Sequence, residues 1–148
     1  MSIKAVLFDL DGTLLPMDQD AFIKAYLGGM AKKLAPHGYN PDELVKAVYA
    51  GMKAMTMNDG SKTNEVAFWN AFTSILGEKV REDIAIFDDF YRNEFQDVKN
   101  ICGFLPEAAQ TVRVLKEMGY RVILATTPMF PSIATESRIR WAGMEPED

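Results

Sequence analysis

Residues 5–15 read Ala-Val-Leu-Phe-Asp-Leu-Asp-Gly-Thr-Leu-Leu, an apolar segment that runs directly into a short acidic turn. Side chains two positions apart on an extended chain point the same way, so Asp9 and Asp11 should converge where the strand ends. Ligands bind at that end of the strands in open α/β sheets. Two carboxylates so close repel each other unless a cation relieves them, and Gly12 allows the chain to turn sharply. The pattern therefore predicts a nucleophile, an acid/base and part of a Mg²⁺ site.

The composition is that of an ordinary globular chain long enough for one domain: 148 residues, 48% hydrophobic and 25% charged. The net charge of −5 argues against a nucleic-acid surface. Its single cysteine, Cys102, cannot form an internal disulfide, and no apolar run resembles a secretory signal or reaches membrane-spanning length. We therefore expect a cytoplasmic protein without a nucleic-acid or membrane partner, while the oligomeric state stays open.

The first strand, expected at residues 3–7, is almost continuously apolar, as is typical of a parallel strand buried on both faces. The pattern then becomes helical over 16–104, which contains most of the aromatic residues and should form a bundle with its own core. Capping and breaking residues predict four helices there: one after Asp18 or Asp20 up to Leu34, one after Asn40 to Met55, one from Thr63 to Gly77, and one from about Arg81 to Phe95.

Beyond the bundle, a helix is predicted from Pro106 to Gly119, then a buried strand at 120–125 and a final helix from Pro131 to Gly143. A helix followed by a strand is half of a βαβ unit that returns to the first strand. The predicted fold class is therefore α/β. Segments 1–15 and 105–148 would form a Rossmann-like core with two recognisable parallel strands, and 16–104 a helical domain.

Two motifs carry a family resemblance. Asp9-Leu10-Asp11-Gly12-Thr13 behind an apolar strand resembles the first motif of the haloacid dehalogenase (HAD)-like hydrolase superfamily, Asp-x-Asp-Gly-Thr. Residues 122–126 resemble its second motif, an apolar strand that ends in Thr or Ser. The resemblance implies that the helical insert is a cap, which gates the site by closing over it.

The resemblance also implies roles for individual residues. Asp9 would be the nucleophile of a phosphatase acting on a small phosphorylated metabolite through an aspartyl phosphate, and Asp11 the general acid and then base. Mg²⁺ would be held by the Asp9 carboxylate and the Asp11 backbone carbonyl. The phosphate-binding residues would be Gly12, Thr126 and Thr127, because a strand end followed by a helix start offers N–H donors to an anion. Thr127 stands where relatives often have Asn.

Other activities remain open at this stage. Dehalogenases of the superfamily typically have Tyr two positions after the nucleophile, so Asp11 favours phosphoester chemistry. Phosphomutases retain both acids, and a truncated or non-catalytic binding protein of the superfamily is a further alternative. A phospho-acceptor receiver domain is disfavoured, because its acceptor Asp lies on a later strand.

The superfamily also has a third-motif Lys and a fourth-motif acidic cluster, both downstream of the second motif. Residues 127–148 contain no Lys, and Arg138 and Arg140 lie too early in the chain to match the third motif. We therefore expect this sequence to be the amino-terminal portion of a longer protein. Motifs three and four are absent from this portion. Such a portion alone should bind Mg²⁺ poorly.

Overall fold

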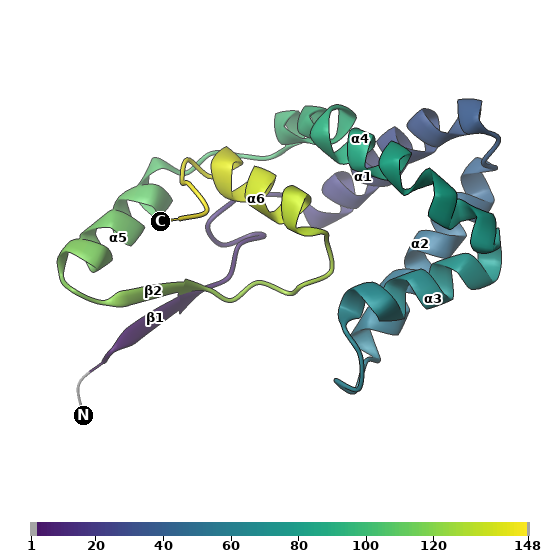
Figure 1. Cartoon of the computed structure of the whole chain (residues 1–148). Coiled ribbons are helices and arrows are strands. Elements are labelled where there is room, and N and C mark those ends of the chain that lie inside the picture. Colours follow the sequence, from purple (N-terminus) through teal and green to yellow (C-terminus); the bar gives the residue numbers. More distant parts are fainter. Residues whose placement is uncertain (1–2, 148) are drawn as a thin grey trace. The chain divides into compact units, whose positions relative to one another are not determined.

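The computed structural model describes residues 3–147 and contains two short parallel strands, β1 (Ala5–Phe8) and β2 (Arg121–Leu124). Ala5 pairs with Arg121 and Phe8 with Leu124, so the two strands run in register with their carboxyl ends at the same edge (Figure 1). The Ala125 N–H donates to the Phe8 carbonyl at 2.7 Å and continues the ladder one residue further. The fold is therefore mixed α/β, as the sequence predicts.

Most of the described chain is helical. In chain order, the α-helices are α1 (Gln19–Leu34), α2 (Pro41–Thr56), α3 (Asn64–Leu76), α4 (Ile84–Arg92), α5 (Pro106–Glu117) and α6 (Ser132–Trp141). Three 3₁₀ segments lie between them, η1 (Ala35–His37), η2 (Glu78–Asp83) and η3 (Glu94–Ile101). The chain divides into two compact units, one made of Met1–Lys24 with Gln96–Asp148 and the other of Ala25–Phe95. The domain boundaries expected at 15/16 and 104/105 remain a proposal.

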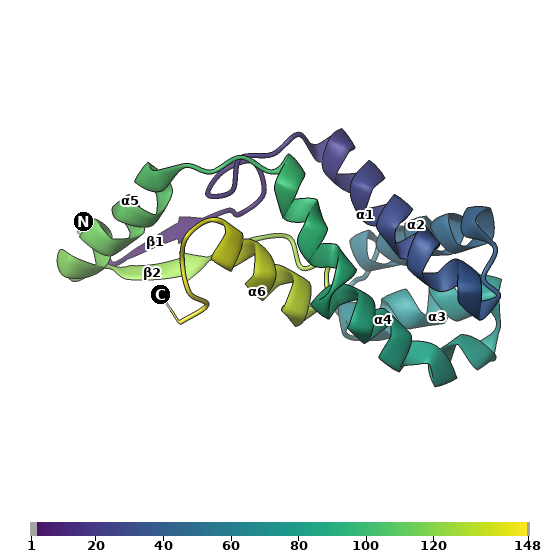
Figure 2. The same cartoon turned by 90° about the horizontal axis from the view of Figure 1, so that it is seen from above.

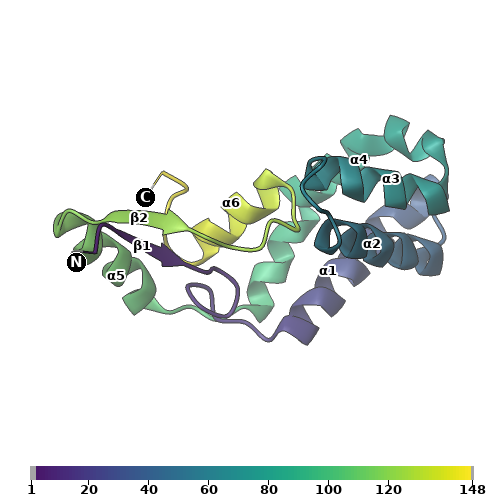
Figure 3. The same cartoon turned by 90° about the horizontal axis from the view of Figure 1, so that it is seen from below.

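In the first unit, α5 and α6 lie on the same face of the strand pair (Figures 1 and 3). The side chains between helices and strands are buried, among them Val112 of α5 and Ala134 and Trp141 of α6. The opposite face is uncovered at β1, where Leu7 is 61% exposed. The prediction that the first strand is buried on both faces is therefore wrong for this structure: its apolar side chains alternate between two faces, and only one face is covered.

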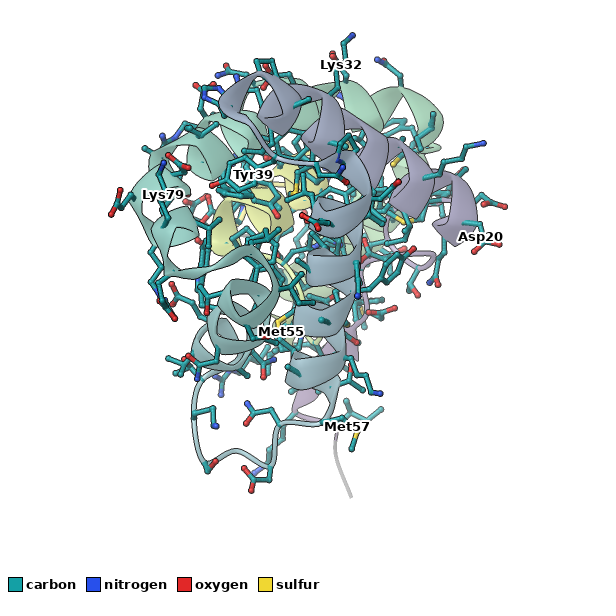
Figure 4. The ribbon with its side chains drawn as sticks, turned by 90° about the vertical axis from the view of Figure 1, so that its right-hand side faces the viewer. Asp20, Lys32, Tyr39, Met55, Met57 and Lys79 are labelled. Atoms are coloured by element: carbon teal, nitrogen blue, oxygen red, sulfur yellow. The ribbon has the colours of Figure 1, made fainter. Side chains whose placement is uncertain are left out.

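The second unit has an aromatic core. Tyr26 of α1 meets Tyr91 and Phe95, with ring centroids 6.3 and 6.0 Å apart, and its hydroxyl lies 2.8 Å from that of Tyr91. Helices α2 and α3 pack side by side, joined through residues 57–63 (Figures 1 and 2). Met55 is buried at 8% exposure, whereas Met57, just after α2, points away from the helices and is 74% exposed (Figure 4). The second unit, Ala25–Phe95, thus has a core of its own.

Most helix starts follow from local chemistry. The Asp18 carboxylate accepts from the Ala21 N–H at 2.8 Å, Asn40 accepts from two N–H groups of the first turn of α2, and Thr63 caps α3. The predicted helix from Arg81 to Phe95 is different in the structure. Only α4 is α-helical, between the 3₁₀ segments η2 and η3, because Asn93 leaves helical geometry at φ −114°, ψ −83°.

Candidate active site at the carboxyl ends of the strands

The turn after β1 carries the two predicted aspartates. Asp9 is exposed, Leu10 is completely buried, and Asp11 is half-buried. The Thr13 and Leu15 N–H groups donate to the Leu10 carbonyl at 3.1 and 2.9 Å, which ties the turn to its buried leucine. The turn therefore buries Leu10 and leaves the side chain of Asp9 exposed and that of Asp11 partly exposed.

Gly12 closes this turn. Its N–H donates to the Leu15 carbonyl at 2.9 Å, and its φ of 78° lies in the left-handed region that favours glycine. Because the bonds of the turn end on the Leu10 and Leu15 carbonyls, they do not use the carbonyl of Asp11. A tight turn thus presents backbone and side-chain oxygens at the end of β1.

The predicted threonines follow β2. Thr126 is half-buried and Thr127 exposed, and they come directly after the Ala125 N–H that bonds to Phe8. The parallel pairing therefore brings all five predicted site residues to one edge: Asp9, Asp11 and Gly12 from one strand end, and Thr126 and Thr127 from the other. Their individual roles remain proposals.

An ion pair that the sequence analysis missed lies in this site. Arg138 of α6 donates through Nη1 to Oδ2 of Asp11. The Arg138 side chain is 1% exposed and that of Asp11 24%, so the pair is largely withdrawn from water. The other oxygen of Asp11, Oδ1, is buried and has no hydrogen-bond partner among the described residues. The positive charge expected near the two carboxylates therefore comes, at Asp11, from the guanidinium of Arg138.

One weak signal for Arg138 existed in the sequence. On α6, Arg138 follows the buried Ala134 by four residues and precedes the buried Trp141 by three, so it occupies the helix face that packs inward. The family's third motif does not account for Arg138, which lies too early in the chain to match it. A charge on the inward face of a helix requires a partner, but the sequence does not identify which carboxylate supplies it.

Cys102 lies near this ion pair. Burial raises the pKa of its thiol, the charge of Asp11 raises that pKa further, and Arg138 opposes the effect. The thiol donates to the Val98 carbonyl at 3.7 Å. A thiol with a raised pKa that donates a hydrogen bond is typical of a structural cysteine rather than a reactive one.

The donor set of the turn fits Mg²⁺. The ion prefers oxygen ligands and commonly takes only one or two carboxylates from the protein, together with waters and substrate phosphate. The exposed Asp9 carboxylate and the carbonyl of Asp11, which the bonds of the turn do not use, are such oxygens. Within residues 3–147, however, no three His, Cys, Asp or Glu side chains are grouped as ligands of one ion.

Parallel strands that bring an acidic turn and a hydroxyl-bearing loop to one edge are typical of α/β proteins that bind ligands at the ends of their strands. Comparison with family models gives a match to haloacid dehalogenase-like hydrolase over residues 3–140. The chain belongs to this hydrolase family, as its two motifs predict. Neither the search of curated proteins nor that of solved structures found a match. Across the part of the chain that is described, no helix combines the length and apolarity needed to cross a membrane.

Proposed function

We propose that this protein is a Mg²⁺-dependent phosphatase that hydrolyses a small phosphorylated metabolite through an aspartyl phosphate. The observation that carries the proposal is the register of β1 and β2, which brings the Asp9–Asp11 turn and the Thr126 loop to the same edge. Membership of a hydrolase family supports a hydrolytic reaction. The second carboxylate supports phosphoester chemistry, because a leaving alcohol needs a proton that Asp11 can supply.

The proposed reaction has two steps. An Asp9 oxygen forms a bond to phosphorus while the bond from phosphorus to the alcohol oxygen breaks, and the proton of Asp11 passes to that oxygen. Water then attacks phosphorus and gives its proton back to Asp11, while the bond to Asp9 breaks and phosphate leaves. Gly12, Thr126 and Thr127 would bind the phosphoryl oxygens through N–H and hydroxyl donors.

Mg²⁺ would be held by the Asp9 carboxylate and the Asp11 backbone carbonyl. When bound, it neutralises charge on the transferring phosphoryl group. The chain's own contribution is the exposed position of Asp9, which a substrate phosphate can reach, and the anchoring of Asp11 in a rigid turn. A reducing compartment, expected from the single cysteine, stays part of this proposal.

We also keep the helical segment 16–104 as a proposed cap domain. Its two ends meet: Met17 and Cys102 form an antiparallel bridge, and the Gly103 N–H donates to the Pro16 carbonyl at 2.7 Å. Gly103 fits closely there, because an added Cβ would lie 2.9 Å from the Cβ of Pro16. Two chain crossings held together in this way are suited to act as a hinge between a core and an inserted domain.

The test compares Asp9→Asn with Asp20→Asn, an exposed carboxylate at the start of α1 that serves as the matched control. Phosphate release from p-nitrophenyl phosphate with Mg²⁺ should fall by at least about 10²-fold in the first variant and stay unchanged in the second. Borohydride, which reduces an acyl phosphate to an alcohol, should convert Asp9 to homoserine during turnover of the wild type. Hydrolysis that survives Asp9→Asn would sink the proposed mechanism.

A further inference from the structure

The side chain of Arg138 is held on every side by its own unit. Besides Asp11, its Nε donates to the Ala134 carbonyl at 3.2 Å and its Nη2 to Oγ1 of Thr135 at 3.3 Å. The guanidinium carbon lies 4.4 Å from the centroid of the Phe130 ring, which adds a cation–π contact. A side chain with so many fixed contacts has one conformation, and so has the carboxylate that it grips.

Burying the guanidinium of Arg138 has a free-energy cost that a purely structural role does not explain. Burying a guanidinium is unfavourable unless it is fully paired, and an apolar side chain at this position of α6 would cover the same core. Its partner Asp11 belongs to the turn that carries the proposed chemistry. The other elements that hold Arg138 are the loop after β2 and the first turns of α6, so one side chain ties both strand ends together.

We propose that Arg138 is a positioning residue for Asp11: its guanidinium fixes the carboxylate in the orientation needed for proton transfer to the leaving group. The inference rests on the proposed phosphatase activity and names a residue on which that activity depends. Proton transfer requires the acid within hydrogen-bond reach of the oxygen that accepts the proton. An arginine that binds Oδ2 restricts the whole Asp11 carboxylate to one orientation.

The choice of substrates separates positioning from mere stability. Phenol is a much weaker acid than p-nitrophenol, so phenyl phosphate needs a proton donor for its leaving group far more than p-nitrophenyl phosphate does. The quantity to measure is kcat/KM for both esters, because it reports the first chemical step and excludes hydrolysis of the aspartyl phosphate. An Asp11 carboxylate that is no longer held in one orientation should therefore change the ratio of the two kcat/KM values. A partly unfolded enzyme lowers both kcat/KM values by the same factor.

Three variants of the protein carry the test. In Arg138→Gln, kcat/KM for phenyl phosphate should fall about 10- to 100-fold and that for p-nitrophenyl phosphate less than about threefold, and Asp11→Asn should show the same bias. Arg138→Lys keeps the charge and should recover most of the loss. The matched control is Arg140→Gln on the same helix, a 47% exposed arginine that pairs with Glu136 and Glu145, and its ratio should equal that of the wild type.

Folding is checked by thermal unfolding of each variant. If Arg138→Gln does not fold, Phe130→Leu and Thr135→Val loosen the arginine without removing its charge, and they should shift the ratio in the same direction by about threefold. Equal losses for both esters in all folded variants would overturn the positioning role while leaving the phosphatase intact. A wild-type protein that hydrolyses neither ester would overturn the proposed function itself, and the positioning role with it.

Discussion

The two aspartates of the first motif should differ sharply in what they contribute to stability. Asp9 is exposed, whereas Asp11 pairs with a buried arginine. Replacing Asp11 with Ala leaves the guanidinium of Arg138 in the protein interior without its carboxylate. Asp9→Ala removes a carboxylate that is not part of that pair. We therefore expect Asp11→Ala to destabilise the protein and Asp9→Ala to leave its stability nearly unchanged, although both abolish the proposed activity.

The magnitude follows from the burial of the pair. Removing one partner of a buried ion pair costs about 3–5 kcal/mol in free energy of unfolding. The lower end applies here, because the Asp11 side chain is 24% exposed and Arg138 keeps its contacts to Thr135, Ala134 and Phe130. We expect a loss of about 3 kcal/mol for Asp11→Ala and less than about 0.5 kcal/mol for Asp9→Ala. For a chain of this length, the larger loss lowers Tm by roughly 6–12 °C.

The assay is urea unfolding followed by tryptophan fluorescence. The chain has two tryptophans, and a Trp69→Phe background leaves only Trp141, which lies on the same helix as Arg138. Adding Arg138→Met to Asp11→Ala should restore part of the lost stability, because it removes the unpaired charge. Equal free energies of unfolding for Asp9→Ala and Asp11→Ala would refute the claim that the ion pair is buried and intact.

Two further predictions concern the helical unit. Gly51→Ala should lower the free energy of unfolding in urea by about 1–3 kcal/mol more than Gly28→Ala does. An added Cβ at Gly51 would lie 2.3 Å from the Phe68 ring, whereas Gly28 has open space. Equal stabilities would contradict the packing of α2 on α3. Lys33 donates hydrogen bonds to Asp89 and Glu94 and thereby lowers the pKa of both carboxyl groups. The stabilisation from these pairs is therefore present above the ordinary pKa of the two groups and is lost as pH falls. Lys33→Gln should thus lower the Tm at about pH 6 and leave it unchanged at about pH 2. The same difference in Tm from the wild type at both pH values would argue against the pairing.

Short-range chemistry explains which parts of the fold the sequence predicts. The caps at Asp18, Asn40 and Thr63 each bond to an N–H group within three residues. The parallel pairing follows from a helix, α5, that leads the chain back to a second apolar segment. The break of α4 was not predictable in this way. The aromatic spacing of Phe87, Tyr91 and Phe95 continues through it, although Asn93 interrupts the helix.

The ion pair shows why the site was only partly predictable. Asp11 and Arg138 are 127 residues apart, and nothing local to either residue indicates the other. What the sequence does provide is an electrostatic requirement, because two carboxylates in one turn need positive charge nearby. Mg²⁺ was the expected answer to that requirement. The structure supplies a fixed guanidinium for Asp11, so the requirement is met without a metal at that carboxylate.

This division of charge has a chemical consequence for the proposed mechanism. A nucleophile should be accessible and bound to the metal that also binds the substrate, whereas an acid/base should be held in a fixed orientation. Exposed Asp9 meets the first condition and arginine-bound Asp11 the second. Two identical residues, separated by one buried leucine, can therefore be assigned different tasks because α6 supplies a cation to only one of them. Neutralising Arg138 should therefore slow proton transfer from Asp11 more than it weakens metal binding.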